Sequence, residues 1–113
     1  MNFKELTVTL FGTLWDIKHI EIEHIDVKDR WQEENGNKGW INIEDFPLSE
    51  DQFLDIFFYI SAPNGTKYDL EVKGIVNLNG EDQEIGYTAS YKVIKGGTLY
   101  INLSKNVNDL LTN

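Results

Sequence analysis

The sequence predicts a single all-β domain that spans residues 1–113 and folds as an antiparallel β-sandwich or an open barrel. Apolar and polar residues alternate over several stretches of strand length, and Gly, Asn and Pro turn signals separate these stretches at short intervals. Counting the stretches gives about seven or eight strands. A chain of 113 residues buries enough surface for a core without disulfides.

The clearest element is a β-hairpin over residues 68–94. Apolar and polar residues alternate along both of its arms, as in strands that are buried on one face. Between the arms lies Asn79-Gly80, the strongest short hairpin signal, because a type I′ turn needs positive φ at both central residues. The two strands are therefore predicted to be antiparallel neighbours.

Two registers of this hairpin keep both apolar sets on one face. A loop formed by Asn79-Gly80 alone pairs Val72 with Tyr87, whereas a longer loop, 79–82, pairs Gly74 with Tyr87. We expect the longer loop, because an aromatic ring then covers the strand glycine and oppositely charged residues face each other further along.

The hairpin is predicted to continue into a third strand, so that residues 68–104 form one C-terminal meander with a single buried face. A loop over residues 95–97 pairs Val93 with Leu99 and keeps the apolar residues of both strands on that face. A glycine-containing loop of this length is typical of a type I turn followed by a bulge.

Helical structure is predicted to be limited to short turns. Residues 49–52 resemble a capping box, and residues 105–111 either form a short helix capped by Ser104 or fray. Residues 53–61 have helical spacing, but they are aromatic and β-branched, which favours a strand. We expect a central strand that is buried on both faces and continues through a hairpin into Tyr68.

The first half of the chain gives shorter stretches. Residues 5–11 alternate as a strand, and residues 39–44 form another after a polar loop over 32–39. Residues 14–29 are extended, but the parity of their apolar positions changes along the stretch. This change requires a bulge near Glu23-His24 or a division into two short strands.

The charge of the chain is acidic and unevenly distributed. The net charge is −9, with 13 acids and 5 bases in residues 1–60 and 6 acids and 5 bases in residues 61–113. This field repels nucleic acid, so direct nucleic-acid binding is not expected, and it attracts a basic partner. There is no cysteine, no signal peptide and no apolar stretch of membrane-spanning length, which together favour the cytoplasm and no membrane contact.

No motif in the sequence predicts catalysis or a cofactor. Nucleophile elbow, metalloprotease, P-loop and dinucleotide motifs are missing, and we expect no enzyme activity. In an unbroken strand His19, Glu21 and Glu23 share a face and suit zinc, but no second histidine-rich segment completes a site. Acids on loops suit calcium, but EF-hand spacing is absent. No metal site is therefore predicted.

The predicted function is a small, acidic binding or structural module that acts through protein–protein contacts. Its contact region is expected in the acidic first half, where Trp31 and Trp40 are placed to meet across a polar loop. The candidate binding residues are Trp15, Trp31, Trp40, Glu21, Glu23, Asp26 and Asp29. One alternative is an acidic inhibitor protein, of phage or plasmid type, that occupies a basic nucleic-acid-binding surface. Another is a carbohydrate-binding module with coplanar exposed aromatic rings.

Overall fold

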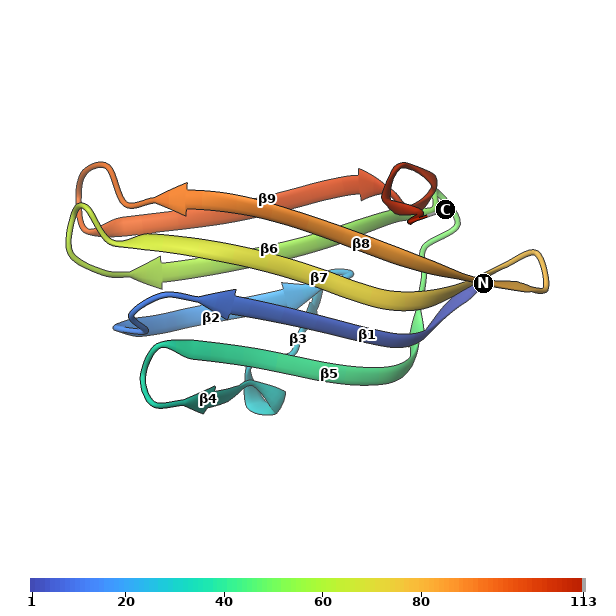
Figure 1. The fold of residues 1–113 in the computed structure, drawn as a ribbon, viewed down its shortest axis with the longest axis horizontal. Coiled ribbons are helices and arrows are strands. Elements are labelled where there is room, and N and C mark those ends of the chain that lie inside the picture. Colours follow the sequence, from blue (N-terminus) through green and yellow to red (C-terminus); the bar gives the residue numbers. More distant parts are fainter. Residues whose placement is uncertain (113) are drawn as a thin grey trace.

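The structure of the chain, a computed structural model that describes residues 1–112, is an all-β sandwich of two antiparallel sheets (Figure 1). The larger sheet has five strands in the order β4-β5-β1-β7-β8, and the smaller sheet has four in the order β3-β2-β6-β9. The predicted fold class is confirmed, with nine strands in residues 1–112. Within the same residues, no helix has the length and apolar character needed to cross a membrane.

The larger sheet is formed by β1 (Asn2–Phe11), β4 (Gln32–Glu34), β5 (Lys38–Pro47), β7 (Lys67–Leu78) and β8 (Glu81–Lys92). The smaller sheet is formed by β2 (Asp16–Ile22), β3 (Ile25–Asp26), β6 (Phe53–Ser61) and β9 (Thr98–Asn106). Two short 3-10 helices are also present, η1 (Lys28–Arg30) and η2 (Val107–Leu110).

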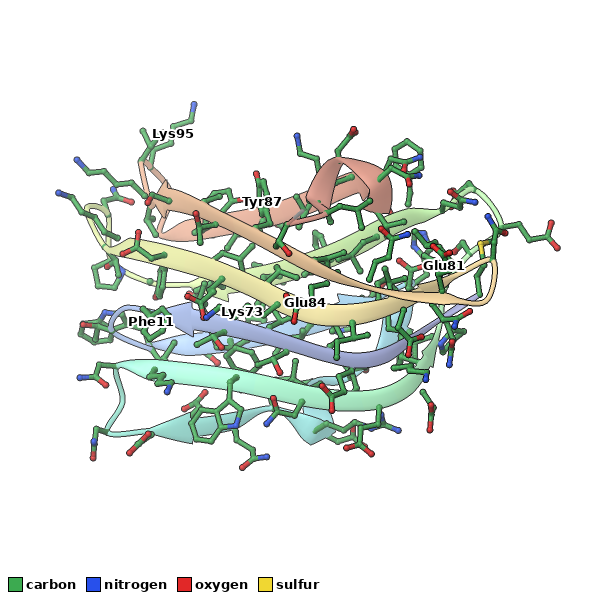
Figure 2. All side chains as sticks on the ribbon, turned by 45° about the vertical axis from the view of Figure 1, so that its right-hand side comes forward. Phe11, Lys73, Glu81, Glu84, Tyr87 and Lys95 are labelled. Carbon is green, nitrogen blue, oxygen red and sulfur yellow. The ribbon has the colours of Figure 1, made fainter. Side chains whose placement is uncertain are left out.

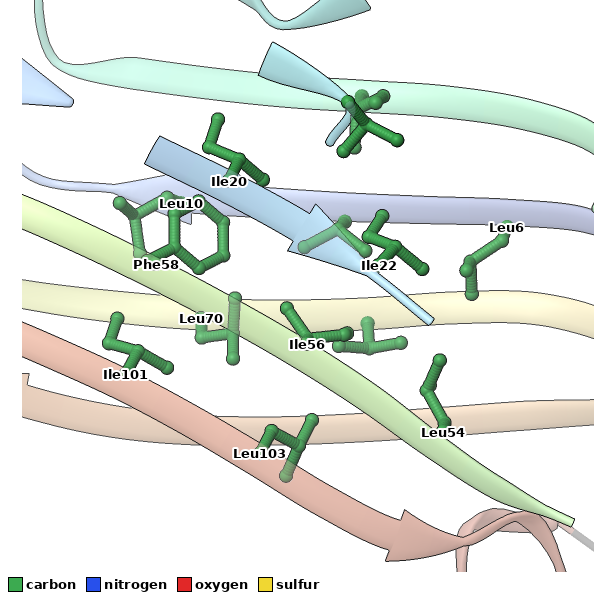
Figure 3. Packing of buried hydrophobic residues seen from close by; sticks show 14 of the residues in the cluster. Leu6, Leu10, Ile20, Ile22, Leu54, Ile56, Phe58, Leu70, Ile101 and Leu103 are labelled. Carbon is green, nitrogen blue, oxygen red and sulfur yellow. The ribbon is translucent and has the colours of Figure 1, made fainter. Parts of the chain in front are cut away.

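The inward-facing side chains of the two sheets form one hydrophobic core between the layers (Figure 3). In β1, Leu6, Val8 and Leu10 are at most 1% exposed. The same holds in β6 for alternate residues from Leu54 to Ile60. Burial of one such side chain contributes about 1.5–3 kcal/mol. Because the alternation has a period of two, every strand that supplies the core also presents a second set of side chains to solvent.

The hairpin of β7 and β8 uses the shorter of the two predicted loops. Asn79 and Gly80 have φ of 53° and 85°, as a type I′ turn requires. Val72 pairs with Tyr87, and Gly74 pairs with Ile85. The expected loop over 79–82 is therefore wrong, since the two-residue turn already satisfies both apolar faces.

Gly74 has a different neighbour from the one expected. A Cβ atom on Gly74 would overlap the carbonyl oxygen of Glu5 in β1. Glu5 lies at the bulge where the register between β1 and β7 shifts, between Phe3 and Glu5. The glycine is thus required for the close approach of two backbones, not for cover by an aromatic ring.

The predicted meander over residues 68–104 is also wrong. β8 ends at Lys92, and β9 belongs to the other sheet, where it pairs with β6. The segment between β8 and β9 is hydrogen-bonded to the segment that follows β6. Val93 N donates to Thr66 O at 2.9 Å, and Ala62 N donates to Gly97 O at 3.0 Å. The alternation correctly predicted which residues of β8 and β9 face the core. The same alternation arises whether two strands are neighbours in one sheet or lie in two sheets that face each other.

β6 confirms the predicted central strand, between β2 and β9, but not its burial on both faces. Only the alternate residues beginning with Leu54 are buried, whereas Phe57 and Tyr59 are half-buried on the opposite face. The predicted hairpin into Tyr68 is wrong, because β7 pairs with β1 and β8 in the larger sheet.

Residues 14–29 contain two short strands, which was one of the two predicted alternatives; the other was a single strand with a bulge near Glu23-His24. β2 and β3 are joined by a turn at Glu23-His24, where φ is 53° and 64°. A bulge between Ile17 and His19 accounts for the first change in parity. The strand expected over 39–44 is longer and covers Lys38–Pro47.

The helical turns are as short as predicted. The backbone N–H of Gln52 donates to the carbonyl of Ser49 at 2.9 Å, which closes one turn. Near the C-terminus, η2 is capped by Asn106 in place of Ser104. Val107 and Leu110 are buried, so this segment packs against the sandwich and does not fray.

Gly74→Ala is expected to lower the free energy of unfolding by about 3 kcal/mol, because the new methyl group meets the β1 backbone, which cannot move without breaking the sheet. The matched control is Gly86→Ala, whose methyl group lies 3.1 Å from the side chain of Thr112 and 4.0 Å from the nearest backbone atom, Val72 O. Urea unfolding monitored by circular dichroism measures both variants. Equal stability of the two variants would contradict the assigned role of Gly74.

Candidate functional site

The outer face of the smaller sheet carries a row of aromatic side chains. Tyr59 on β6 and Tyr100 on β9 are directly opposite each other, with ring centroids 5.0 Å apart and planes at 20°. Phe57 lies 6.1 Å from Tyr100 at 24°, and His19 on β2 lies 6.3 Å from Phe57 at 60°. We call His19, Phe57, Tyr59 and Tyr100 the aromatic row.

The rings of the row are stacked on one another. Centroid distances of 5.0 and 6.1 Å with small interplanar angles are those of offset-stacked pairs, and the ring of Tyr100 contacts both Tyr59 and Phe57. Tyr100 nevertheless remains 60% exposed. The row therefore presents apolar ring surface to solvent from a rigid, hydrogen-bonded strand.

Carboxylates lie at the β2 end of the row. Glu21 on β2 pairs with Asp26 on β3. The His19 Nε2 is hydrogen-bonded to Glu21 Oε2, and its Nδ1 is 4.0 Å from Asp26 Oδ2. His19 thus connects the aromatic rings to two acidic side chains.

A third carboxylate, Asp55, lies beside the row on β6, where it precedes Phe57 by two residues and shares its face. It accepts a hydrogen bond of 2.5 Å from Ser104 Oγ, and His24 Nε2 is 3.4 Å from it. A shallow depression of about 300 Å³ lies between these groups. Its lining residues are Glu21, His24, Asp55, Ile56, Phe57 and Asn102.

The lysine of β2 does not offset this negative charge. Lys18 Nζ lies 2.6 Å from Asp16 Oδ2 on the same strand. The hydrogen bond to Asp16 and the charge of that carboxylate raise the pKa of Lys18 above its ordinary value. Lys18 and Asp16 neutralise each other locally, so Glu21, Asp26 and Asp55 set the charge of the face.

Glu23 lies apart from the acidic residues with which the sequence grouped it. Its side chain is buried, and its carboxylate accepts hydrogen bonds from Ser49 N at 3.2 Å, Ser49 Oγ at 2.7 Å and Asp55 N at 2.7 Å. The turn that begins at Glu23 ends the alternation of β2, so this residue leaves the face that His19 and Glu21 share. Among residues 1–112, no group of three or more potential ligands is arranged to hold a metal ion.

The tryptophans named as candidates lie in separate places. Trp15 is 60% exposed in the link between β1 and β2. Trp31 packs edge-on against Phe58 in the core, with centroids 5.5 Å apart, and covers Gly39. Trp40 lies beneath Lys38, whose Nζ is 5.4 Å from its ring. The expected meeting of Trp31 with Trp40 does not occur, because β4 and β5 place them on opposite faces of the larger sheet.

Asp29, the remaining candidate, lies in η1, outside the aromatic row. Of the candidates from the sequence, the structure brings Glu21 and Asp26 together beside the row, and Asp26 and Asp29 line a separate depression with Lys28. The sequence did not lead to the selection of Phe57, Tyr59, Tyr100 or Asp55 as binding residues. The signal was present, since the odd positions of residues 53–61 hold Phe, Asp, Phe, Tyr and Ser, but the alternation was interpreted as a second buried face.

Glu23→Ala is expected to lower the free energy of unfolding by about 3 kcal/mol, because the backbone N–H groups of Ser49 and Asp55 lose their acceptor in a buried place. Glu21→Ala is the control, since Glu21 is only half-buried and a carboxylate of this kind contributes about 0–1 kcal/mol. Chemical unfolding of both variants checks this. A loss for Glu23→Ala no greater than that for Glu21→Ala would contradict it.

The function has to be inferred from these residues alone. Comparison of the chain with models of protein families, with curated proteins and with solved structures finds no match.

Proposed function

We propose that this chain is a non-enzymatic binding module that contacts a basic protein partner through the outer face of its smaller sheet. The observation that carries the proposal is the aromatic row, with Tyr100 60% exposed between Tyr59 and Phe57 and with carboxylates at its side. The proposal keeps the cytoplasm as the compartment, in line with a chain that lacks cysteine.

An interface explains why apolar rings occupy this face. An outward face of an antiparallel sheet is ordinarily polar, and aromatic side chains there leave apolar surface in water. Tyr is enriched among the residues that dominate binding energy, since it supplies a large contact area at a low cost in conformational entropy. The mutual stacking of Tyr59, Tyr100 and Phe57 fixes their orientation before a partner arrives.

The charge of the face favours a basic partner. Glu21, Asp26 and Asp55 flank the row, and residues 1–60 carry 13 acids against 5 bases. An arginine of the partner suits both elements, because its guanidinium forms paired hydrogen bonds with carboxylates and its aliphatic stem packs on the apolar surface of the rings that remains exposed. The acidic inhibitor alternative is a special case of this proposal, in which the partner is a nucleic-acid-binding protein.

The carbohydrate alternative receives less support. A flat sugar-binding platform needs ring faces that are open to solvent, whereas the rings of Tyr59 and Tyr100 cover each other at 5.0 Å. The depression beside Phe57 is bordered by Glu21 and Asp55, so it suits a cationic side chain better than a neutral sugar.

Tyr100→Ala is expected to weaken binding of the partner by about thirtyfold, which corresponds to the loss of a central aromatic anchor. Trp15→Ala is the matched control, because Trp15 is equally exposed, at 60%, but lies outside the row. Partners are captured on the purified chain from cell extract, and their affinities for the two variants are then measured by surface plasmon resonance at two salt concentrations.

A second variant, Glu21→Gln with Asp26→Asn, is expected to slow association and to reduce the salt dependence, since charged groups at the rim act mainly on the association rate. If Trp15→Ala abolishes binding and Tyr100→Ala does not, the contact lies elsewhere and the proposal fails. An acidic captured partner, or affinities independent of salt, would equally refute the basic partner.

A further inference from the structure

The two open sides of the sandwich, at β3 and at β8, differ in how well the core is covered there. On the side of β3, the segment that follows it covers the core: Val27 is 1% exposed, and Trp31 packs on Phe58. On the side of β8, where β8 and β9 cross in the view of Figure 1, inward-facing residues remain partly uncovered. Tyr87, Ala89 and Tyr91 of β8 are only half-buried.

The neighbouring strand shows that this exposure is a property of the edge. The β7 residues that pair with Tyr87, Ala89 and Tyr91 are Val72, Leu70 and Tyr68, which are at most 1% exposed. β9, the last strand of the smaller sheet, crosses β8 in Figure 1, and no further strand of residues 1–112 lies beyond β9 in that sheet. Figure 2 shows Tyr87 at this border and Lys95 projecting beyond it.

The chain itself closes part of this side with an extended segment. Leu111 forms an antiparallel bridge with Ile85 of β8, and Thr112 N donates to Glu84 O at 3.1 Å. Beyond Ile85 this cover ends. β9 pairs only with β6 among the strands of residues 1–112, so its other edge carries backbone groups without a strand partner.

We propose that the free edge of β9 accepts an extended segment of another protein, which lengthens the smaller sheet by one strand. Alternate apolar side chains of this segment cover Tyr87, Ala89 and Tyr91, and backbone hydrogen bonds to β9 hold it in place. A strand of about seven residues matches the length of the edge. This inference concerns an edge, and it does not depend on the contact proposed for the outer face.

The lysines at the two ends of β9 indicate which charges the bound segment carries. Lys95 precedes β9, and Lys105 near its end lies over the ring of Tyr87, with Nζ 5.9 Å from the centroid. Neither lysine has a carboxylate of residues 1–112 within 4.0 Å. An occupant with apolar residues at alternate positions and an acidic residue at each end satisfies both the tyrosines and the lysines.

A second copy of this chain fits the same edge poorly. Antiparallel pairing of two β9 strands about Ile101 places Lys105 of one copy opposite Gly97 of the other, next to its Lys95. Like charges then meet at both ends of the pair, which is destabilising. An inward-facing lysine on an edge strand is also a known protection against pairing between identical edges.

A capped seven-residue peptide with glutamate at both ends, valine at positions 2, 4 and 6 and threonine between them tests the proposal. In titrations followed by NMR, we expect amide shifts and slower hydrogen exchange over Thr98–Leu103. The variant Lys95→Gln with Lys105→Gln is expected to weaken binding at least about fivefold at low salt. Lys28→Gln, on the opposite side of the sandwich, is the control and leaves binding unchanged.

Two further peptides separate the contributions. Replacing the glutamates with lysine is expected to weaken binding, and replacing the valines with proline to abolish it, because proline removes backbone donors. Absence of shifts in β9, or equal binding of the glutamate and lysine peptides, overturns the proposal. Light scattering that shows a dimer with β9 amides already protected overturns it as well and assigns the edge to a second copy.

Discussion

The sandwich depends on the contact between the inward side chains of β1 and β7 in the larger sheet and those of β6 in the smaller one. These strands lie within their sheets, each flanked by two neighbours, and their inward residues are almost completely buried. A strict alternation with a period of two follows, because a shift by one residue would place every core side chain in water. The same constraint decides which residues are left for contacts with other molecules.

Local patterns predicted much of this architecture. Alternation identified the arms of the β7–β8 hairpin, and Asn79-Gly80 located its turn, although not the length of the loop. The change in parity across Glu23-His24 predicted either a bulge or a division there, and the structure shows the division into β2 and β3. These features depend on residues that are close in sequence, so the sequence is sufficient to find them.

Long-range pairing was not accessible in the same way. Parity places Val93, Ile101 and Leu103 toward the core, but it does not distinguish strands that are neighbours in one sheet from strands that face each other across two. Gly74 illustrates the same difficulty, since its role depends on Glu5, which is distant in the sequence. Whether β8 is followed by a neighbour or by a crossover is decided by the hydrogen bonds between residues 62–66 and 93–97.

The candidate site was predicted only in part for a related reason. Glu21 and Asp26 were selected for their charge, and they do lie together beside the aromatic row. The rings of Phe57 and Tyr59 were assigned to the interior because both faces of β6 are apolar. The three tryptophans were selected as candidates, but the fold separates them. The stacking of Tyr100 on Tyr59 follows from the pairing of β6 with β9, which the sequence does not reveal.

Both proposed contact surfaces belong to the smaller sheet, one on its outer face and one along its edge. β9 contributes to each, since Tyr100 points outward and the backbone of the same strand forms the edge. The larger sheet instead provides the support for this strand through the core. The two proposals thus place recognition on the outer face and the free edge of the smaller sheet, while the inward side chains of that sheet belong to the shared core.

The packing of Trp31 has an optical consequence. Among the indoles of the chain, Trp31 contacts an aromatic ring of the core, whereas Trp15 is already in water and Trp40 lies on the outer face of the larger sheet beneath Lys38. Phe58 belongs to the smaller sheet and Gly39, which Trp31 covers, to the larger one. Changes in the intrinsic fluorescence of this protein therefore report chiefly on the contact that Trp31 makes with both sheets. A red shift of the emission signals that the two sheets have separated at this contact.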